Sequence, residues 1–453
     1  MSIALVWFRR DLRVADHPAL VAARRDHVVV ACLYVLEPRL RAAAGRRRRD
    51  QHAAFLTGLD AALREQGARL LVVEGDPSSV VPRLVDELDA AAVHVNADTT
   101  PHAVRRDAAV AAALGVPLVE HWGTLVHPPG TVLTGKGTLS QVFTPFYRRW
   151  AATERAAPPG PGSGRLVAPD VAGAVAVPRP DAEPALAGDT DAVAARVEAF
   201  AGRVGTYEDQ RDLLAVDGTS GLSVDLRFGT VSPTSLADRF DPLPGGEPFV
   251  RQLAWRDWYA HLLAERPHLP DAALKPAYDG IAWRDDDQGF AAWCEARTGY
   301  PIVDAAMRQL LETGLMHNRA RMIVGSFLVK DLLIDWRRGE RFFRRLLLDG
   351  DVASNAGNWQ WVAGTGADAA PYFRIFNPIS QSRKFDPTGA YLRRWLPERA
   401  ERDDGAIHWP LDAGPLELQA AGVTLGETYP APIVDHGAAR DRCLAAYQAA
   451  VKR

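Results

Sequence analysis

The chain has 453 residues, and a usual domain size of roughly 150 residues indicates two or three domains. Its hydrophobic content of 47% and charged content of 24% are typical of a globular protein with a large core, which excludes a disordered chain. The net charge of −3 excludes a chain that is basic throughout, so any DNA-binding surface has to come from local clusters.

Short apolar runs alternate with helical patterns over the first 130 residues. The runs, each expected to be a buried parallel strand, are 3–8, 27–35, 70–73, 92–95 and 117–120. This alternation predicts a doubly wound, parallel-sheet α/β domain of Rossmann-like type. No Gly-x-Gly-x-x-Gly motif follows the first run, which argues against a nicotinamide cofactor. Asn96 and Asp98 follow the fourth run, where such sheets bind ligands, although an ordinary polar loop is the simpler interpretation.

The composition changes twice after this domain. Residues 151–190 are dominated by Ala, Pro and Gly, which predicts an extended linker. Beyond residue 193 the pattern indicates long helices without convincing strands. The clearest of these predicted helices are 249–263, 299–311 and 317–336. We therefore predict three parts, which are an α/β domain over 1–130, a linker over 131–192 and an all-helical domain over 193–453.

Signals for export, disulfides and metal binding are missing from the sequence. The cysteines, Cys32, Cys294 and Cys443, are too far apart for a Cys-x-x-Cys site, and they fit a reducing compartment. The first residues turn charged at once, unlike a signal peptide, and no apolar run is long enough for a membrane span. We therefore expect a cytoplasmic protein with no metal site and no membrane association.

Two segments of the helical part have side chains that suit a ligand. The segment 207–223 ends in a loop rich in Gly, Ser and Thr, whose N–H and O–H groups suit phosphate, although a capped loop is the simpler interpretation. The next predicted helix carries a stripe that is both aromatic and polar: Gln252, Trp255, Arg256 and Tyr259. Flat rings beside a guanidinium suit stacked bases, whereas a core stripe would usually be aliphatic.

The segment 346–361, LLLDGDVASNAGNWQW, is too polar in its middle for a core helix and too rich in small residues for a surface helix. Asp349 and Asp351 suit a hydroxylated or cationic ligand, and Asn355 adds a group that both donates and accepts hydrogen bonds. Arg321 is the candidate partner of Asp349, since a buried carboxylate needs a cation or several donors. The alternative is a helix-turn-helix corner with ordinary core tryptophans. Local basic clusters that suit DNA lie nearby: Arg337, Arg338, Arg341, Arg344 and Arg345, with Arg383, Lys384, Arg393 and Arg394.

Long motifs along nearly the whole chain are similar to one protein family. They are VWFRRDLRVADHPAL, DGTSGLS, WRDWYAHL, TGYPIVDAAMRQLLETGLMHNRARMIVGSFLVKDLLIDWRRGERFF and LDGDVASNAGNWQWVAGTGADAAPYFRIFNP. The chain resembles the photolyase/cryptochrome family, and most closely the bacterial class I cyclobutane pyrimidine dimer photolyases. The resemblance implies an antenna domain, a helical domain that holds FAD, and UV-damaged DNA as the partner of a monomer. The implied activity is light-driven repair, in which excited reduced FAD passes an electron to a flipped-out pyrimidine dimer.

The resemblance also implies a set of residues that bind the flavin. The phosphates and the adenine side match Tyr207, Thr219, Ser220, Leu222 and Ser223. The ion pair beside the isoalloxazine ring matches Arg321 and Asp349, and a flavin-facing acid matches Asp351. Asn355 matches the residue beside flavin N5, where an amide favours reduced flavin. The tryptophan chain that carries electrons to the flavin matches Trp359, Trp336 and Trp283.

For the substrate, the resemblance implies contacts that depart from the family pattern at one place. The aromatic residues that embrace the dimer match Trp255 and Trp361, pocket positions match Asn318 and Met322, and DNA contacts match Arg211 and Arg383. Gln252 stands where class I enzymes carry a Glu that helps to stabilise the dimer radical anion. Gln is familiar there from (6-4) enzymes and animal cryptochromes, so a blue-light photoreceptor is the alternative. Repair of (6-4) lesions is disfavoured, because Asn318 and Met322 replace two histidines.

The expected antenna chromophore is 8-hydroxy-5-deazaflavin. Asn96 and Asp98, followed by Pro101, are similar to the deazaflavin-binding pattern of some relatives, although Thr100 replaces an acid that is usual there. Methenyltetrahydrofolate, FMN and an empty site remain the alternatives.

Overall fold

The chain folds into two compact units in the computed structural model, which describes residues 3–157, 160–399, 406–412 and 424–452. The first unit comprises Met1–Glu208 and Ser220–Pro267, and the second comprises Asp209–Thr219 and His268–Arg453. The predicted division at residues 130 and 192 stays a prediction.

The first unit is built on a parallel sheet. Its main strands are β1 (Ile3–Phe8), β2 (Val29–Leu36), β3 (Leu70–Glu74), β4 (Ala90–Asn96) and β5 (Leu118–His121). They lie in the order β5-β4-β1-β2-β3, and all of their pairings are parallel. Because the order reverses on either side of β1, the carboxyl ends of β1 and β4 form the switch point where such sheets usually bind ligands. The predicted doubly wound α/β fold is confirmed.

Part of the segment that was predicted to be a linker joins this sheet. β6 (Arg165–Val167) pairs with β2 in parallel, and β7 (Ala174–Val175) pairs with β3 in an antiparallel direction. An extended segment beside a strand satisfies unpaired backbone groups of that strand, which the composition of 151–190 did not indicate.

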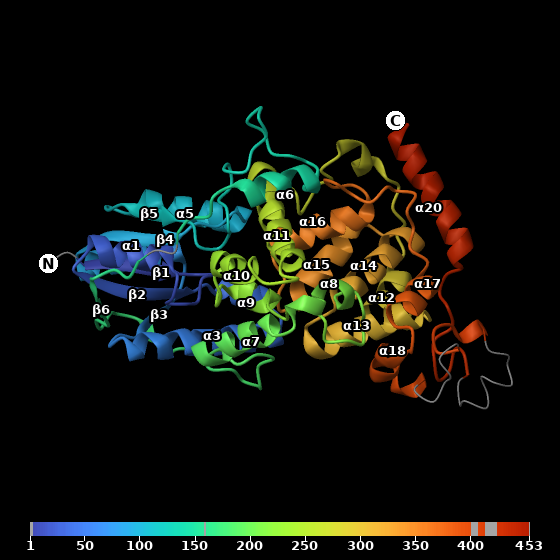
Figure 1. Ribbon diagram of the computed structural model, residues 1–453, viewed down its shortest axis with the longest axis horizontal. Coiled ribbons are helices and arrows are strands. Elements are labelled where there is room, and N and C mark those ends of the chain that lie inside the picture. The colour runs from blue at the N-terminus through green and yellow to red at the C-terminus, as the bar shows by residue number, and fades with distance from the viewer. Residues whose placement is uncertain (1–2, 158–159, 400–405, 413–423, 453) are drawn as a thin grey trace. The chain divides into compact units, whose positions relative to one another are not determined.

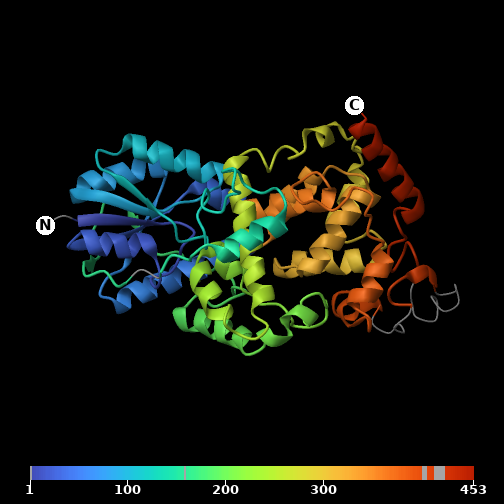
Figure 2. The same ribbon diagram turned by 45° about the horizontal axis from the view of Figure 1, so that its top comes forward.

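Helices cover both faces of the sheet (Figures 1 and 2). The helices around the sheet are α1 (Pro18–Asp26), α2 (Pro38–Ala43), α3 (Arg46–Glu65), α4 (Pro77–Leu88) and α5 (Pro101–Ala113). α7 (Thr190–Ala201) packs against α3, and α6 (Phe143–Ala152) packs against α11 (Glu247–Glu265) away from the sheet (Figure 1). Several begin with proline, whose fixed φ and missing N–H suit the first helical position. The first unit also contains η1 (Val204–Thr206), α9 (Ser223–Phe228), α10 (Pro233–Phe240) and α11 (Glu247–Glu265), while α8 (Tyr207–Gln210) spans the boundary between the units.

The second unit is helical, as predicted. Its longer helices are α12 (Asp287–Cys294), α13 (Pro301–Thr313), α14 (Asn318–Ser326), α15 (Trp336–Leu346), α16 (Val352–Ala363), α17 (Pro378–Phe385), α18 (Ala390–Trp395) and α20 (His436–Val451). Short turns add η2 (Pro276–Gly280), η3 (Phe327–Asp331), η4 (Pro397–Arg399) and η5 (Pro410–Asp412). A large apolar core joins α12 to α18 and includes Trp293, Trp336 and Trp359.

The helix that was predicted over 317–336 is wrong in its second half. α14 ends at Ser326, η3 is a π-helical turn, and the next helix begins only at Trp336. Leu333 has a φ of 54°, which a helix does not allow, and Asp335 caps α15 by accepting a hydrogen bond from Arg337 N at 2.9 Å. The apolar periodicity of the segment hid this break, because the residues remain buried across it.

Within the part of the chain that the structure describes, no helix is both long and apolar enough to cross a membrane.

Candidate functional site

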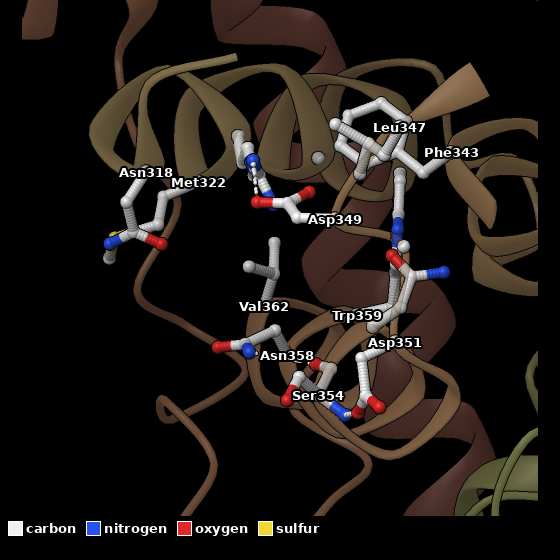
Figure 3. Close-up of a pocket in the computed structure, with 14 residues that line it drawn as sticks. Asn318, Met322, Phe343, Leu347, Asp349, Asp351, Ser354, Asn358, Trp359 and Val362 are labelled. Carbon is white, nitrogen blue, oxygen red and sulfur yellow. Dashed lines mark hydrogen bonds and ion pairs between the residues drawn. The ribbon is translucent and has the colours of Figure 1, made fainter. Parts of the chain in front are cut away.

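A cavity in the second unit lies between α14, α16 and the turn that joins α15 to α16 (Figure 3). It encloses about 560 Å³, including its open mouth. The residues that line it are Asn318, Arg321, Met322, Gly325, Phe343, Leu347, Asp349, Gly350, Asp351, Ser354, Asn355, Asn358, Trp359 and Val362. The unusual segment 346–361 therefore forms the corner between two helices and also part of the cavity wall, so the two interpretations of this segment do not exclude each other.

Asn355 presents its carbonyl oxygen to the cavity. Its Nδ2 donates to the main-chain oxygen of Glu340 and to Glu340 Oε1, both at 2.9 Å. Because these bonds occupy both N–H groups of the amide, the oxygen is the group left for a ligand. Glu340 is fully buried, and burial raises the pKa of its carboxyl, while Arg344 opposes that rise.

Arg321 and Asp349 form the ion pair that the sequence indicated. Arg321 NH2 lies 2.8 Å from Asp349 Oδ2, and Arg321 Nε donates to the main-chain oxygen of Met316 at 2.8 Å. The guanidinium is thereby fixed in the cavity wall, with a charge-assisted bond that orders the carboxylate. Asp351, two residues on, caps α16 by accepting from Ser354 N at 2.9 Å.

Asn318 and Met322 lie one turn apart on α14, with Asn318 Nδ2 and Met322 Sδ 3.9 Å apart. They stand at one side of the cavity, while Phe343 and Leu347 close another side with apolar surface (Figure 3). The cavity thus joins a polar, adaptable side to an apolar one, a combination that suits a flat heterocycle with polar edges.

The three tryptophans that were matched to an electron chain belong to one core. Trp336 and Trp359 are buried within it, and Trp283 packs against it. Trp359 forms part of the cavity wall and contacts Phe343 edge to face at a centroid distance of 5.1 Å. A Cβ at Gly339 would collide with the Trp359 ring, so glycine at this place lets α15 approach α16 closely. Their role in electron transfer stays a prediction.

The remaining predicted residues of the second unit lie outside the cavity lining. Trp361 is half-buried on α16, and Thr219 and Arg211 belong to the short segment Asp209–Thr219. Arg383 is exposed and pairs with Asp412. Their predicted contacts with flavin or DNA are not tested by this arrangement.

Several arginines of the basic cluster around α15, which the sequence indicated as a surface for DNA, form ion pairs within the protein. Arg338 pairs with Asp287 at 2.6 Å, Arg344 with Glu340 at 3.4 Å, and Arg337 with both Asp335 and Asp279. Acids that are distant in sequence supply part of this pairing, which the local count of arginines could not show.

In the first unit, Gln252 and Trp255 lie on α11. Trp255 stacks on Phe143 at a centroid distance of 3.7 Å and an angle of 11°, so one of its ring faces is already covered. Gln252 is half-buried, and its Nε2 donates to the main-chain oxygen of Pro248 at 3.1 Å. One N–H of the Gln252 amide is therefore already used within its own helix.

The predicted phosphate-binding residues of the first unit lie around the start of α9. Tyr207 is buried against Phe200 and Phe249, and Leu222 is fully buried. Ser220 Oγ accepts from Leu222 N at 3.3 Å, and Ser223 is the first residue of α9. This hydrogen bond orders the turn before α9, while the N-cap position of α9, Leu222, has no side-chain cap, and the role of the loop toward phosphate stays a prediction.

Asn96 and Asp98, at the carboxyl end of β4, are engaged by the protein itself. Asn96 is only 2% exposed, and its Nδ2 donates to Asp11 Oδ2 at 2.7 Å. Asp98 pairs with Arg10 at 3.1 Å. His17 Nε2 also lies 2.9 Å from Asp11 Oδ2, which completes a buried network at the predicted antenna position.

Sequence reasoning missed Glu340, Ser354 and Asn358. Glu340 carried a signal, because it is an acid on the apolar stripe of an Arg-rich helix, between Trp336 and Phe343. No cluster of three or more His, Cys, Asp or Glu side chains that could hold a metal ion occurs among the described residues.

Comparison with known proteins places this geometry in a family. Residues 4–162 match the model of DNA photolyase, and residues 249–449 match the FAD binding domain of DNA photolyase. The chain is 42% identical to deoxyribodipyrimidine photo-lyase of Escherichia coli, over 100% of both chains.

Solved structures agree with the sequence matches. A bacterial class III photolyase from Agrobacterium tumefaciens has a TM-score of 0.90 and 38% identity, with 100% of this chain and 98% of that chain covered. A cryptochrome from Synechocystis sp. has a TM-score of 0.90 and 29% identity, with 98% and 99% covered. The chain belongs to the photolyase/cryptochrome family.

Proposed function

We propose that this chain is a light-driven DNA repair lyase that binds FAD and splits cyclobutane pyrimidine dimers. The observation that carries the proposal is the cavity of the second unit. It places an amide acceptor, an ion pair and a redox-active indole around one open space, within a chain that is similar over its full length to a deoxyribodipyrimidine photo-lyase.

The residues present fit a flavin. Asn355 would accept from an N–H group at the ring edge, and Arg321 with Asp349 would hold the polar end of the heterocycle. Phe343 and Leu347 supply the apolar surface that a fused ring needs. Bound FAD supplies the excited-state electron donor, whereas the protein supplies placement and electrostatics.

Each residue then has a physical task. Asn355, held by Glu340, keeps an acceptor fixed without any rearrangement when charge moves, which is how preorganised groups stabilise changing charge. The walls of Phe343 and Leu347 exclude water, which strengthens the electrostatic contacts inside. Trp359, with Trp336 and Trp283, supplies easily oxidised rings that would carry electrons from the surface toward a bound flavin.

The substrate is damaged DNA in this proposal. Photolyases take the damaged dinucleotide of one strand out of the stack, which brings the lesion to a pocket in the protein. We assign lesion contacts to Asn318 and Met322 at the polar side of the cavity, and to Trp361, Trp255 and Gln252. Arg211 and Arg383 are assigned to the phosphates, where they position DNA without reading its sequence.

An antenna chromophore at Asn96 and Asp98 stays part of the proposal. Asn96 Nδ2 donates to Asp11 and Asp98 pairs with Arg10, whereas Asn96 Oδ1 has no hydrogen-bond partner among the described residues. We assign no step to an antenna. 8-Hydroxy-5-deazaflavin, methenyltetrahydrofolate, FMN and an empty site remain the candidates for a binding test.

A blue-light photoreceptor is the second candidate. The likeness to the Synechocystis cryptochrome and the amide at Gln252 favour it. Such a protein would keep the flavin and the tryptophans and would signal to a partner instead of splitting dimers.

The test begins with anaerobic reduction of the purified protein. Oligothymidine that carries cyclobutane dimers is added, blue light is applied, and the return of thymine absorbance is followed against a dark control. Recovery only in the light establishes dimer repair. If the protein binds flavin but no absorbance returns, the repair proposal is wrong and the photoreceptor takes its place, with (6-4) lesions as a further substrate to exclude.

A further inference from the structure

A line of three side chains leads from the surface of α15 to the cavity. Arg344, whose side chain is 35% exposed, lies 3.4 Å from Glu340 Oε2. Glu340 Oε1 accepts from Asn355 Nδ2, and Asn355 turns its oxygen to the cavity. The two oxygens of one buried carboxylate thus contact a surface cation on one side and the cavity amide on the other.

We propose that Arg344 is a positioning residue that sets the ionisation of Glu340 and, through it, the acceptor strength of Asn355 toward bound flavin. This inference rests on flavin binding in the cavity, which is part of the proposed function, but not on repair of any DNA lesion.

The geometry of Glu340 supports this role. Oε2 has no hydrogen-bond donor among the residues that the structure describes, so the ion pair with Arg344 is its principal stabilising contact. A fully buried carboxyl without a cation would keep its proton, because burial favours the neutral form. Three charged groups act on Glu340: Arg344 and Arg341 favour the ionised form and Asp271 opposes it.

The ionised form changes what Asn355 does. A carboxylate accepts the Asn355 N–H more strongly than a neutral carboxyl does, and it polarises the amide so that the carbonyl oxygen becomes a better acceptor. A stronger acceptor favours flavin that carries a proton on the ring nitrogen it faces. Protonation of Glu340 should therefore weaken this preference, although the fold around Asn355 stays the same.

The experiment uses the flavin-loaded, full-length protein and two variants, Arg344→Met and Glu340→Gln. Arg345→Met is the matched control, because Arg345 is exposed on the same helix and has no ion pair with Glu340. Flavin reduction is titrated across pH by absorbance, which measures how much one-electron-reduced flavin is protonated. Infrared spectra of the same samples follow the band of a protonated carboxyl.

We expect a pH-dependent step in the wild type and in Arg345→Met. In Arg344→Met the step should move to higher pH, because loss of the cation raises the pKa of Glu340. In Glu340→Gln both the step and the carboxyl band should be absent. The inference is overturned if Arg344→Met titrates like the wild type, or if Glu340→Gln keeps the step.

Two further outcomes are distinguishable. If Glu340→Gln does not fold, Arg344→Met still decides the question, since Arg344 lies at the surface. If the protein shows the expected titration but leaves pyrimidine dimers unrepaired, the repair proposal fails while this inference stands.

Discussion

Two buried asparagines, one in each unit, show how the same group serves different ends. Asn96 and Asn355 each donate an N–H to a buried acid, Asp11 at 2.7 Å and Glu340 at 2.9 Å. Around Asp11, burial alone would raise the pKa, but His17 and Arg9 outweigh it and hold the pKa of that carboxyl well below its ordinary value. Around Glu340, burial prevails and the pKa is raised. An acid with several partners secures a fold, whereas an acid with few partners beside a cavity remains adjustable.

The largest effect is expected from a substitution that breaks the first network, the one around Asp11. Asp11→Ala removes the acceptor that Arg9 N, His17 and Asn96 share, and leaves each of these buried groups with fewer hydrogen bonds. We expect a loss of about 3–5 kcal/mol in the free energy of unfolding, measured in urea. Asp26→Ala, which removes an exposed ion pair with Arg25, is the control and should leave the free energy of unfolding almost unchanged.

The pH dependence of this effect has a definite sign. Because the folded state lowers the pKa of Asp11, its stabilising contribution is present above the unfolded pKa of about 4 and is lost as the pH falls below it. A gap between wild type and Asp11→Ala that stays constant down to pH 2 would contradict this assignment.

A change in the second network, Glu340 with Asn355, should alter the redox behaviour of bound flavin and not the stability of the fold. Asn355→Asp replaces the amide N–H donors by a second acid beside Glu340. Beside Glu340 the new acid would keep a proton, and the oxygen of a neutral carboxyl is a weaker acceptor toward the cavity than the amide oxygen. We expect about tenfold less one-electron-reduced flavin under anaerobic illumination, since loss of a hydrogen bond to the flavin of about 1.4 kcal/mol corresponds to that factor. Asn358→Asp, on the same helix and also in the cavity wall, is the control. An equal yield in both variants would remove Asn355 from its assigned place.

Trp359→Phe separates electron supply from repair. The ring remains large enough to fill the cavity wall, but phenylalanine is much harder to oxidise than tryptophan. Photoreduction of the oxidised flavin should slow strongly, while repair by chemically reduced protein should persist. Trp395→Phe changes a core tryptophan without a ring contact to Trp359 and should leave both rates unaltered. Loss of repair in pre-reduced Trp359→Phe would assign this residue a different role.

The smallest effect concerns a third amide, Gln252. Gln252→Glu introduces the carboxyl that the family resemblance implies at this place and should raise the yield of dimer splitting per absorbed photon by a few-fold, about 1 kcal/mol at most. The measurement is thymine absorbance against absorbed light. An unchanged or lower yield would show that this pocket is built around the amide.

The sequence predicted the architecture well, because the signals for it are local. Apolar runs indicated the five main strands, and the need of a buried acid for a cation indicated the ion pair of Asp349 with Arg321. The flavin cofactor was predicted from the family resemblance, because the periodicity of apolar residues carries no information about a cofactor.

What the sequence did not reveal depends on contacts between distant segments. Glu340 became significant only when α15 and α16 placed it against Asn355, and Arg337 and Arg338 lost their apparent freedom to acids far away in the chain. The break after Asp331 was hidden because a buried π-helical turn keeps the apolar pattern of a helix. The Asn96 amide is buried beside a polar partner, His17, which is distant in the sequence and so could not be recognised from it.

Helix α16, which carries Asn355 and Trp359, is held at both of its ends. Asp351 caps its start, and at its end Ala363 O accepts from Lys330 Nζ at 3.0 Å and from Tyr447 at 2.7 Å. Because both ends of α16 are fixed by hydrogen bonds, the dipoles around the cavity can reorganise little when an electron reaches or leaves the cavity. We therefore expect the rates of electron transfer to and from this cavity to vary only weakly with temperature. This should hold even at low temperatures, at which more loosely packed parts of the protein no longer move.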